Sequence, residues 1–230
     1  MPATAVLVTT AAAELDRQVA TLLDLGYPAL AGLTTSAFRD LLDPLRPVAA
    51  GLGDLPAAAP GHAPVILVVT RDLVAPEDTV PLLRLPVRGR QAAPPGVVDR
   101  NHEPGSLATY APLDVLAIPE HPAYLLLDVD RGEEFRDVRP EDALPVVLRR
   151  GRTPLTIDEG VALVTHAPHL LERNRCFMLA GSRRADRRVP AMWISGRAPK
   201  LGWCWDGNPH SWLGLASAGA RRGRGPILPG

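Results

Sequence analysis

The chain contains few of the residue types that usually reveal a function. Only two of its 230 residues are cysteines, and only 4% are aromatic. The cysteines form no Cys-x-x-Cys pair, which excludes a disulfide framework. Together with His166, His169 and His210 they lack the close-spaced ligand pairs of structural zinc sites. We therefore predict no metal and no cofactor.

Long apolar runs are missing too. A membrane-spanning helix needs about 18 or more consecutive apolar residues, and no stretch of the sequence approaches that length. The first residues carry no basic segment ahead of an apolar run, so a signal peptide is not expected. We expect a cytoplasmic protein without a membrane partner.

What the chain has in quantity is proline, glycine and small apolar residues. Proline and glycine number 25 and 20, and the hydrophobic fraction is 46%. Such a composition predicts many turns and short elements around a core of leucine, valine and alanine. Lys200 is the only lysine, so arginine supplies every other cation.

The formal net charge of zero hides two opposed regions. Residues 171–230 hold 11 basic and 3 acidic residues, a formal charge of +8, whereas residues 1–170 carry −8. All four tryptophans and both cysteines also lie in residues 171–230. Such asymmetry indicates a binding surface near the carboxyl end.

The first 60 residues are expected to be helical and rich in loops. Apolar residues at spacings of three and four predict a helix over 11–25, with Glu14, Arg17 and Gln18 on its solvent side. A shorter helix is expected from Thr34 or Thr35 to about Pro44. Residues 44–64 show no periodicity and are interpreted as a surface connection.

Two apolar runs, 65–69 and 124–129, predict buried strands. Residues 86–112 are mostly loop. A helix is expected over 141–150, and a second one follows a capping box that Thr156 and Glu159 form. That helix should run to about His166, because Pro168 interrupts it. His166 and His169 are therefore expected at the surface or at a helix end.

Alternating patterns in the last quarter predict strands over 175–180, 189–195, 200–205 and 212–216. The fold class is α+β, with N-terminal helices, two central strands and a mostly antiparallel C-terminal sheet. We expect one domain over residues 1–220, mixed over 61–170 and rich in strands over 171–220. Residues 221–230 are expected to be a flexible tail.

Four phrases are similar to a family of uncharacterised actinobacterial proteins, known only as a domain of unknown function. They are LTIDEGVAL (155–163), CFMLAGSR (176–183), VPAMWIS (189–195) and LGWCWDGNPHSWLG (201–214). The resemblance covers most of the chain and is sharpest over about 120–216. It implies relatedness, and no catalytic residue, ligand or partner.

The principal candidate site is a tryptophan-lined surface. Because side chains alternate along a strand, Trp203 and Trp205 should share a face and Cys204 should point away. Trp193 on a neighbouring strand, with Trp212, would extend this platform, and Asn208 and His210 would lie at its edge. The alternative interpretation is that these rings form the core of an otherwise aromatic-poor protein.

Four arginines, Arg183, Arg184, Arg187 and Arg188, flank the expected turn between two strands. Beside indoles they would suit an anionic small molecule or a nucleotide, whose charge they would neutralise. A nucleic-acid partner is not expected, because no nucleic-acid motif surrounds these arginines, but the sequence does not exclude one. Alternatively, the arginines are solvated or paired with acids of the same chain.

Binding is thus the favoured function, and an enzyme is the competing class. Its candidates are Cys204 as nucleophile with His210 as base and Asp206 as orienter, or the polar loop Asp99–Glu103 with His102 and Glu103. A buried cysteine is more often an inert apolar filler. A third possibility is a protein that associates with itself or with a partner through its acidic and basic faces.

Overall fold

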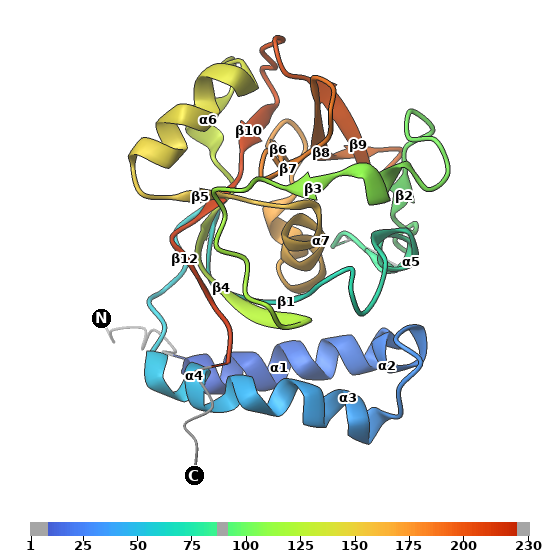
Figure 1. Cartoon of the computed structure of the whole chain (residues 1–230), viewed down its shortest axis with the longest axis vertical. Coiled ribbons are helices and arrows are strands. Elements are labelled where there is room, and N and C mark those ends of the chain that lie inside the picture. The colour runs from blue at the N-terminus through green and yellow to red at the C-terminus, as the bar shows by residue number, and fades with distance from the viewer. Residues whose placement is uncertain (1–8, 87–91, 225–230) are drawn as a thin grey trace, which may run out of the picture.

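The computed structural model describes residues 9–86 and 92–224. Figure 1 shows four layers stacked along the long axis: N-terminal helices, a first sheet, helix α7 (Ile157–His166), and a second sheet from the C-terminal part. This is the single α+β domain that the sequence predicts. No helix among the described residues is both long and apolar enough to cross a bilayer.

The N-terminal layer contains the two predicted helices and two short ones. Its helices are α1 (Ala11–Asp24), α2 (Tyr27–Leu30), α3 (Thr35–Leu42) and α4 (Arg46–Leu52). The Thr34 hydroxyl accepts from the Ala37 N–H at 3.1 Å, which confirms the expected cap of α3. The interpretation of residues 44–64 as a surface connection is wrong at its start, because α4 lies there and buries Ala49. The helix is too short for its periodicity to be detected.

The first sheet has the two predicted central strands at its heart. Strands β1 (His62–Val69) and β4 (Ala123–Asp130) pair antiparallel. Three short strands complete it: β5 (Thr153–Pro154), β11 (Ser217–Ala218) and β12 (Ala220–Arg222). Val65 and Leu67 face the N-terminal helices, while Ile66 and Val68 face the other core. Both faces of the strand are covered, which explains its continuous apolar run.

Helix α7 packs against the opposite face of this sheet. The capping box is confirmed: the Thr156 hydroxyl accepts from the Glu159 N–H at 3.3 Å, and the Glu159 carboxylate accepts from the Thr156 N–H at 2.7 Å. The remaining helical elements are α5 (Pro76–Thr79), α6 (Pro140–Arg149) and the 3-10 turns η1 (Asp43–Leu45), η2 (Val80–Leu82), η3 (Ser106–Thr109), η4 (Glu133–Phe135) and η5 (Pro168–Leu170).

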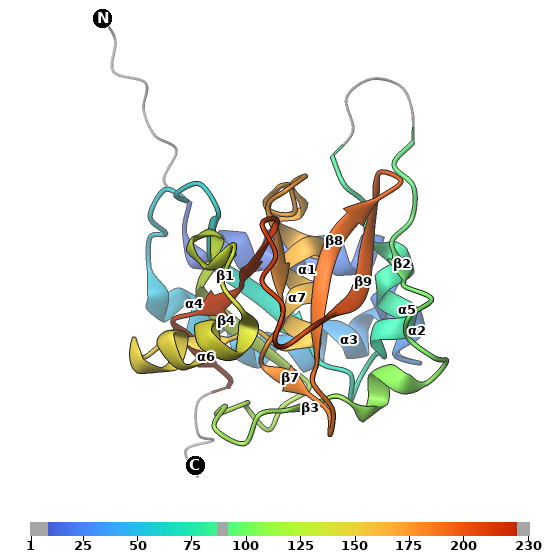
Figure 2. The same ribbon diagram turned by 90° about the horizontal axis from the view of Figure 1, so that it is seen from above.

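The second sheet is the C-terminal sheet that the sequence predicts. Its strands, in spatial order, are β10 (Leu213–Leu215), β6 (Cys176–Met178), β8 (Arg188–Ser195), β9 (Ala198–Trp205) and β2 (Val97–Val98). The central three are antiparallel, and the two outer strands pair in parallel. Figure 2 shows the long β8–β9 hairpin with β2 beside it. A two-stranded ladder, β3 (Ala111–Pro112) with β7 (Ser182–Arg183), lies apart.

The C-terminal segment is part of the core, so the predicted start of the tail is wrong. Arg221 and Arg222 belong to β12, which pairs with β4. The Arg221 side chain is only 4% exposed, and its Nε lies 2.5 Å from Oε1 of Glu159, which is fully buried. The Tyr124 hydroxyl donates to the same carboxylate at 2.8 Å. An arginine-rich sequence looks solvated, but this arginine neutralises a buried acid. Residues 225–230 of the expected tail lie outside the described residues.

Candidate functional site

One hollow lies along β1 and is lined by residues of the N-terminal layer, the first sheet and the end of α7. It is bounded by α1, the segment 55–58, the first half of β1 (62–66) and the end of α7 with the turn after it (166–169). Its volume is about 250 Å³. Because three histidines line it, His62, His166 and His169, we call it the histidine cleft. None of the sequence-based candidate sites lies here.

One wall of the histidine cleft is a polar cluster on α1. Glu14, Arg17 and Gln18 are three and four residues apart, so they share one side of the helix. The Arg17 guanidinium binds both oxygens of Glu14, at 2.8 and 2.5 Å, and donates to the His166 carbonyl at 3.2 Å. Helix α1 is thereby tied to the end of α7.

Gln18 joins the same cluster to β1. Its amide nitrogen donates to Glu14 at 2.7 Å and to the Val65 carbonyl at 2.9 Å, and its oxygen accepts from the Leu67 N–H at 2.6 Å. Strand β1 is an edge strand, so Gln18 satisfies backbone groups that no neighbouring strand reaches. The expectation that Gln18 faces solvent is wrong, since it is 1% exposed.

Hydrogen bonds and opposite charge keep Glu14 and Arg17 ionised. Burial alone would raise the pKa of Glu14, but hydrogen bonds from Arg17 and Gln18 outweigh it and keep the pKa below its usual value. The same hydrogen bond to Glu14 raises the pKa of Arg17. The cleft wall therefore carries a closed ion pair with no net charge.

His166 occupies the innermost position. Its side chain is 6% exposed, and within the described residues neither ring nitrogen makes a hydrogen bond of normal geometry. Burial, helped by the positive charge of Arg17 and opposed by Glu14 and the Leu67 backbone, lowers the pKa of His166 to about 3. The imidazole is neutral near pH 7. The prediction that His166 lies at a helix end is correct, since it is the last residue of α7, but it does not lie at the surface.

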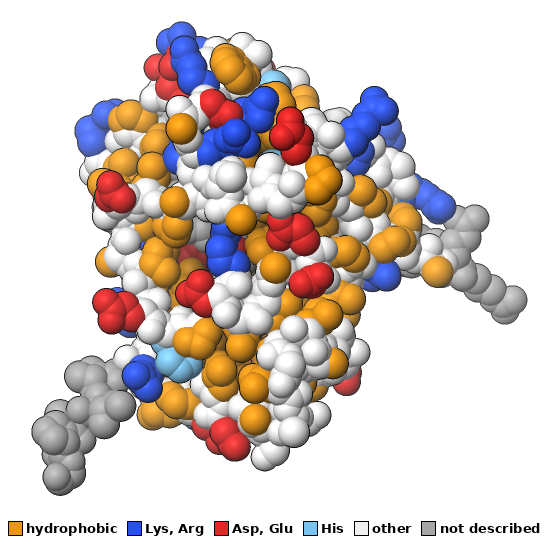
Figure 3. Space-filling model, turned by 45° about the vertical axis from the view of Figure 1, so that its right-hand side comes forward, with side chains coloured by type: hydrophobic (Ala, Val, Ile, Leu, Met, Phe, Trp, Pro, Cys, Tyr) orange, Lys and Arg blue, Asp and Glu red, His pale blue; other side chains and the backbone are white. Residues whose placement is uncertain are grey.

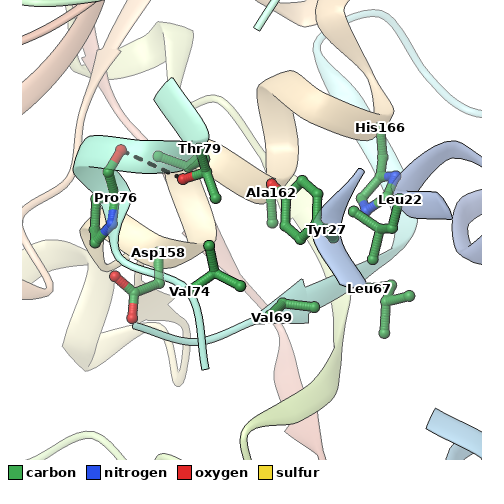
Figure 4. A pocket seen from close by; sticks show the side chains of 11 residues that line it. Leu22, Tyr27, Leu67, Val69, Val74, Pro76, Thr79, Asp158, Ala162 and His166 are labelled. Carbon is green, nitrogen blue, oxygen red and sulfur yellow. Dashed lines mark hydrogen bonds between the residues drawn. The ribbon is translucent and has the colours of Figure 1, made fainter. Parts of the chain in front are cut away.

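A second, much narrower cavity lies beyond His166. Figure 4 shows the imidazole at one end of it beside Leu22, and Asp158 at the opposite end. Its volume is about 10 Å³, roughly the space for one water molecule. His166 thus separates the histidine cleft from a cavity too small for a ligand.

The outer histidines are more accessible. His62, at the start of β1, is half-buried, with its Nε2 3.9 Å from Oδ1 of Asp130. His169, in η5, is exposed. Across residues 9–86 and 92–224 no group of three or more acidic, histidine or cysteine side chains is arranged to hold a metal ion.

The predicted tryptophan platform is divided between two faces of the C-terminal sheet. Trp203 and Trp205 share a face, with ring centroids 6.4 Å apart, while Cys204 points to the core. Trp193 is opposite Lys200 in the β8–β9 register, so it lies on the other face, where it packs edge-on against Trp212 at 6.1 Å. The register separates the rings, because Trp193 pairs with Lys200, which lies an odd number of residues from Trp203 and therefore on the opposite face.

The rings are half-buried, and Trp205, at 40% exposure, is the most open of them. The Trp203 indole donates to the Asn101 carbonyl at 2.9 Å, and Arg188 stacks over its ring at 4.5 Å from the centroid. Asn208 is exposed, and His210 lies against Trp212 with centroids 5.6 Å apart. Cations and rings do meet here, but the arginine already covers one indole.

The four arginines of the turn all have acidic partners within the chain. Arg183 pairs with Asp206 at 3.1 Å, and Arg187 pairs with Glu141. Arg184 and Arg188 both bind Asp186, at 3.0 and 3.7 Å. On the face shown in Figure 3, basic and acidic side chains are interspersed. This is the internally paired arrangement that the sequence left open as the alternative.

Cys204 lacks the surroundings of a nucleophile. It is 7% exposed, and burial raises its pKa to about 12, whereas reactive cysteines have a lowered pKa. Asp206, the expected orienter, is engaged by Arg183 instead. Burial also lowers the pKa of His210.

The loop Asp99–Glu103 lines a second hollow of about 410 Å³ beside β2. Asp99 pairs with Lys200 at 3.0 Å, so the loop is fastened to β9 and lies beside Trp203. His102 is buried edge-on against Tyr110, with centroids 5.7 Å apart, and burial lowers its pKa. Glu103 is exposed. The structure thus brings together two candidate regions that are 100 residues apart.

The histidine cleft was missed because its parts carry weak signals. The spacing of Glu14, Arg17 and Gln18 predicts one shared helix side, and only the folded chain shows that this side meets β1 and α7. The local sequence sign of the cluster is the spacing of Glu14 and Gln18, which are four residues apart beside the apolar side of the helix.

Comparison with known proteins identifies a family model that covers most of the chain. The model of a protein family described as a family of unknown function, DUF5701, matches residues 21–224. No curated protein and no solved structure matches the chain. The matched span includes the C-terminal phrases and most of the residues that line both hollows, while Glu14, Arg17 and Gln18 precede it.

Proposed function

Since the chain belongs to DUF5701, a family of unknown function, we propose from its geometry that it binds a small molecule in the histidine cleft. Ligand sites are concave, mostly apolar and equipped with a few converging polar groups. Leu55, Pro56 and Ile66 are among the apolar residues that line the cleft, and the histidines and Arg17 are among its polar groups. Binding is also the function class that the composition favours.

One observation carries the proposal: a neutral, buried imidazole in the cleft wall has unused hydrogen-bonding capacity. An imidazole with neither nitrogen paired costs on the order of 1–3 kcal/mol per unsatisfied group. Natural cores rarely keep such a group without a partner. Both ring nitrogens of His166 are enclosed in this structure, so the ring has to turn toward the cleft for a ligand to reach one of them. The ligand would then supply one donor or acceptor and recover part of this free energy.

Filling the cleft tests the proposal. Ala58 lines it and Ala59 does not, and both are exposed neighbours in the same segment. We expect Ala58→Trp to abolish shifts of the His166 ring signals in ¹³C–¹H spectra when octanoate, octan-1-ol or octylamine is added, and Ala59→Trp to retain them. If none of the three probes moves a histidine signal of the wild-type protein at millimolar concentration, the proposal is wrong.

A second candidate is the surface around Trp203 and Trp205, where we infer a weaker site for an anionic aromatic molecule such as a nucleotide. The supporting observation is that Trp205 is 40% exposed beside the Arg188–Trp203 stack. Tryptophan fluorescence titrated with adenosine monophosphate at low salt tests it. We expect quenching that Trp205→Leu removes, and an unchanged signal in the wild-type protein would contradict it.

A further inference from the structure

The histidine cleft also indicates what kind of ligand it takes, an inference that rests on the proposed function. The acceptors of the polar cluster are already used. Glu14 accepts three hydrogen bonds from Arg17 and Gln18, and Gln18 itself spans the Val65 carbonyl and the Leu67 N–H. The His166 carbonyl accepts from Arg17. The carboxylate, amide and carbonyl groups of this cluster therefore leave few acceptors for a ligand donor.

Donors, in contrast, are left over. Arg17 uses Nε and Nη2, whereas its Nη1 has no hydrogen-bond partner in residues 9–86 and 92–224. His62 lies 3.9 Å from Asp130, too far for a hydrogen bond. His169 makes no side-chain hydrogen bond within the same ranges and is exposed. The unused capacity of the cleft therefore consists of a guanidinium N–H, which can only donate, and of imidazoles, each of which in its neutral form has one N–H donor and one acceptor nitrogen.

These donors match a carboxylate better than other head groups. An ionised carboxylate only accepts, and its two oxygens can take about four hydrogen bonds. Bonds between a guanidinium and a carboxylate are among the stronger ones in proteins. An alcohol offers fewer acceptor sites, and an ammonium group offers none and would meet Arg17 as a like charge.

The rest of the cleft sets the size and polarity of the ligand. Its volume of about 250 Å³ lies below the usual range of ligand pockets, which starts near 300 Å³. The segment 55–58 contributes only Leu, Pro and Ala side chains, and Pro64 and Ile66 continue the apolar wall. We propose that the histidine cleft binds a small aliphatic monocarboxylic acid, with its carboxylate at Arg17 and the histidines and its hydrocarbon chain along residues 55–58.

Isothermal titration calorimetry with octanoate, octan-1-ol and octylamine tests this choice. We expect octanoate to bind tightest, by about tenfold or more over the alcohol, because charge-assisted hydrogen bonds are worth more than neutral ones. If the alcohol or the amine binds as well as the acid, the inference is overturned while ligand binding in the cleft stands. If none of the probes binds, both proposals fail.

A matched pair of double variants locates the head group. Glu14→Gln/Arg17→Met removes the cleft ion pair without changing the net charge. Asp43→Asn/Arg46→Met removes an exposed i,i+3 pair outside the cleft, which joins Arg46 Nε to Asp43 at 2.9 Å, together with the contact of Arg46 to Asp16 at 2.5 Å. The cleft variant should lose octanoate affinity about tenfold and keep octan-1-ol affinity, and the control should bind both probes like the wild type. Unchanged octanoate affinity in the cleft variant would overturn the assignment, and circular dichroism checks that both variants fold.

Discussion

The buried ion pair between Arg221 and Glu159 offers the sharpest test of how the chain holds its C-terminal end. We predict that Arg221→Met destabilises the protein by about 3–5 kcal/mol, the usual cost of leaving one charge of a buried pair uncompensated. Glu159 is fully buried, and among the described residues its carboxylate would keep the Tyr124 hydroxyl and the Thr156 N–H as partners. Methionine preserves most of the side-chain volume, so the lost charge dominates.

The magnitude is large against the stability of an ordinary domain, about 5–15 kcal/mol. For a chain of this length each kcal/mol lowers the melting temperature by roughly 2–4 °C. We therefore expect a loss of about 6–20 °C, and an earlier urea midpoint with an unchanged slope, measured by tryptophan fluorescence. Arg222→Met is the matched control, because Arg222 is the exposed neighbour in the same strand.

A double-mutant cycle isolates the pair. Glu159→Gln removes the charge that Arg221 neutralises, so the two substitutions together should cost less than the sum of their separate effects. The reasoning is refuted if the free energy of unfolding of Arg221→Met lies within about 1 kcal/mol of the wild-type value, or if the effects of the two substitutions simply add.

Three further predictions follow from single positions. Burial lowers the pKa of His166 to about 3, so as the pH falls the unfolded chain takes up the His166 proton before the folded chain does. The free energy of unfolding should therefore fall by up to about 1.4 kcal/mol for each pH unit as the pH is lowered from about 6.5 to 3. His166→Leu should flatten this dependence, and urea titrations that are identical for the variant and the wild type would contradict the prediction. Gly132 has φ +72°, and a Cβ there would lie 1.9 Å from the Leu215 carbonyl oxygen. Gly132→Ala should therefore lower the free energy of unfolding in urea by more than about 2 kcal/mol. Gly105→Ala should lower it by about 1 kcal/mol, because Gly105 has a similar φ but open space around its Cβ position. Cys204 should react with iodoacetamide only in denaturant, and rapid labelling of the native protein would restore the thiol-enzyme hypothesis.

The elements that the sequence predicts correctly are those whose pattern is enforced by burial. The runs at 65–69 and 124–129 are strands because both faces are covered, and the capping box at Thr156 forms locally, so no distant contact was needed to foresee it. Helix α4 has only seven residues, which is too short for a periodic signal. The strand β12 has three residues and depends on pairing with β4, which sequence patterns do not contain.

The candidate site shows the same limit more strongly. Alternation correctly places Trp203 and Trp205 together and Cys204 inward, since that rule acts within one strand. Whether Trp193 joins them depends on the register between two strands, and the register of the β8–β9 hairpin puts it on the far face. Composition detected the positive charge of the C-terminal region but not its partners.

Those partners change what the charge asymmetry means. Arg187 binds Glu141 and Arg221 binds Glu159, and both acids belong to residues 1–170, the negatively charged part of the chain. A positive segment folded onto a negative one neutralises itself, and its surface then exerts little long-range attraction on an anion. For the aliphatic acid that we propose, recognition would instead come from a hollow whose hydrogen-bond donors have no partner in the described part of the protein. Among the hollows of the described residues, the histidine cleft combines apolar walls with a guanidinium nitrogen without a partner, so affinity for acids should track Arg17 and not the arginines of the C-terminal turn.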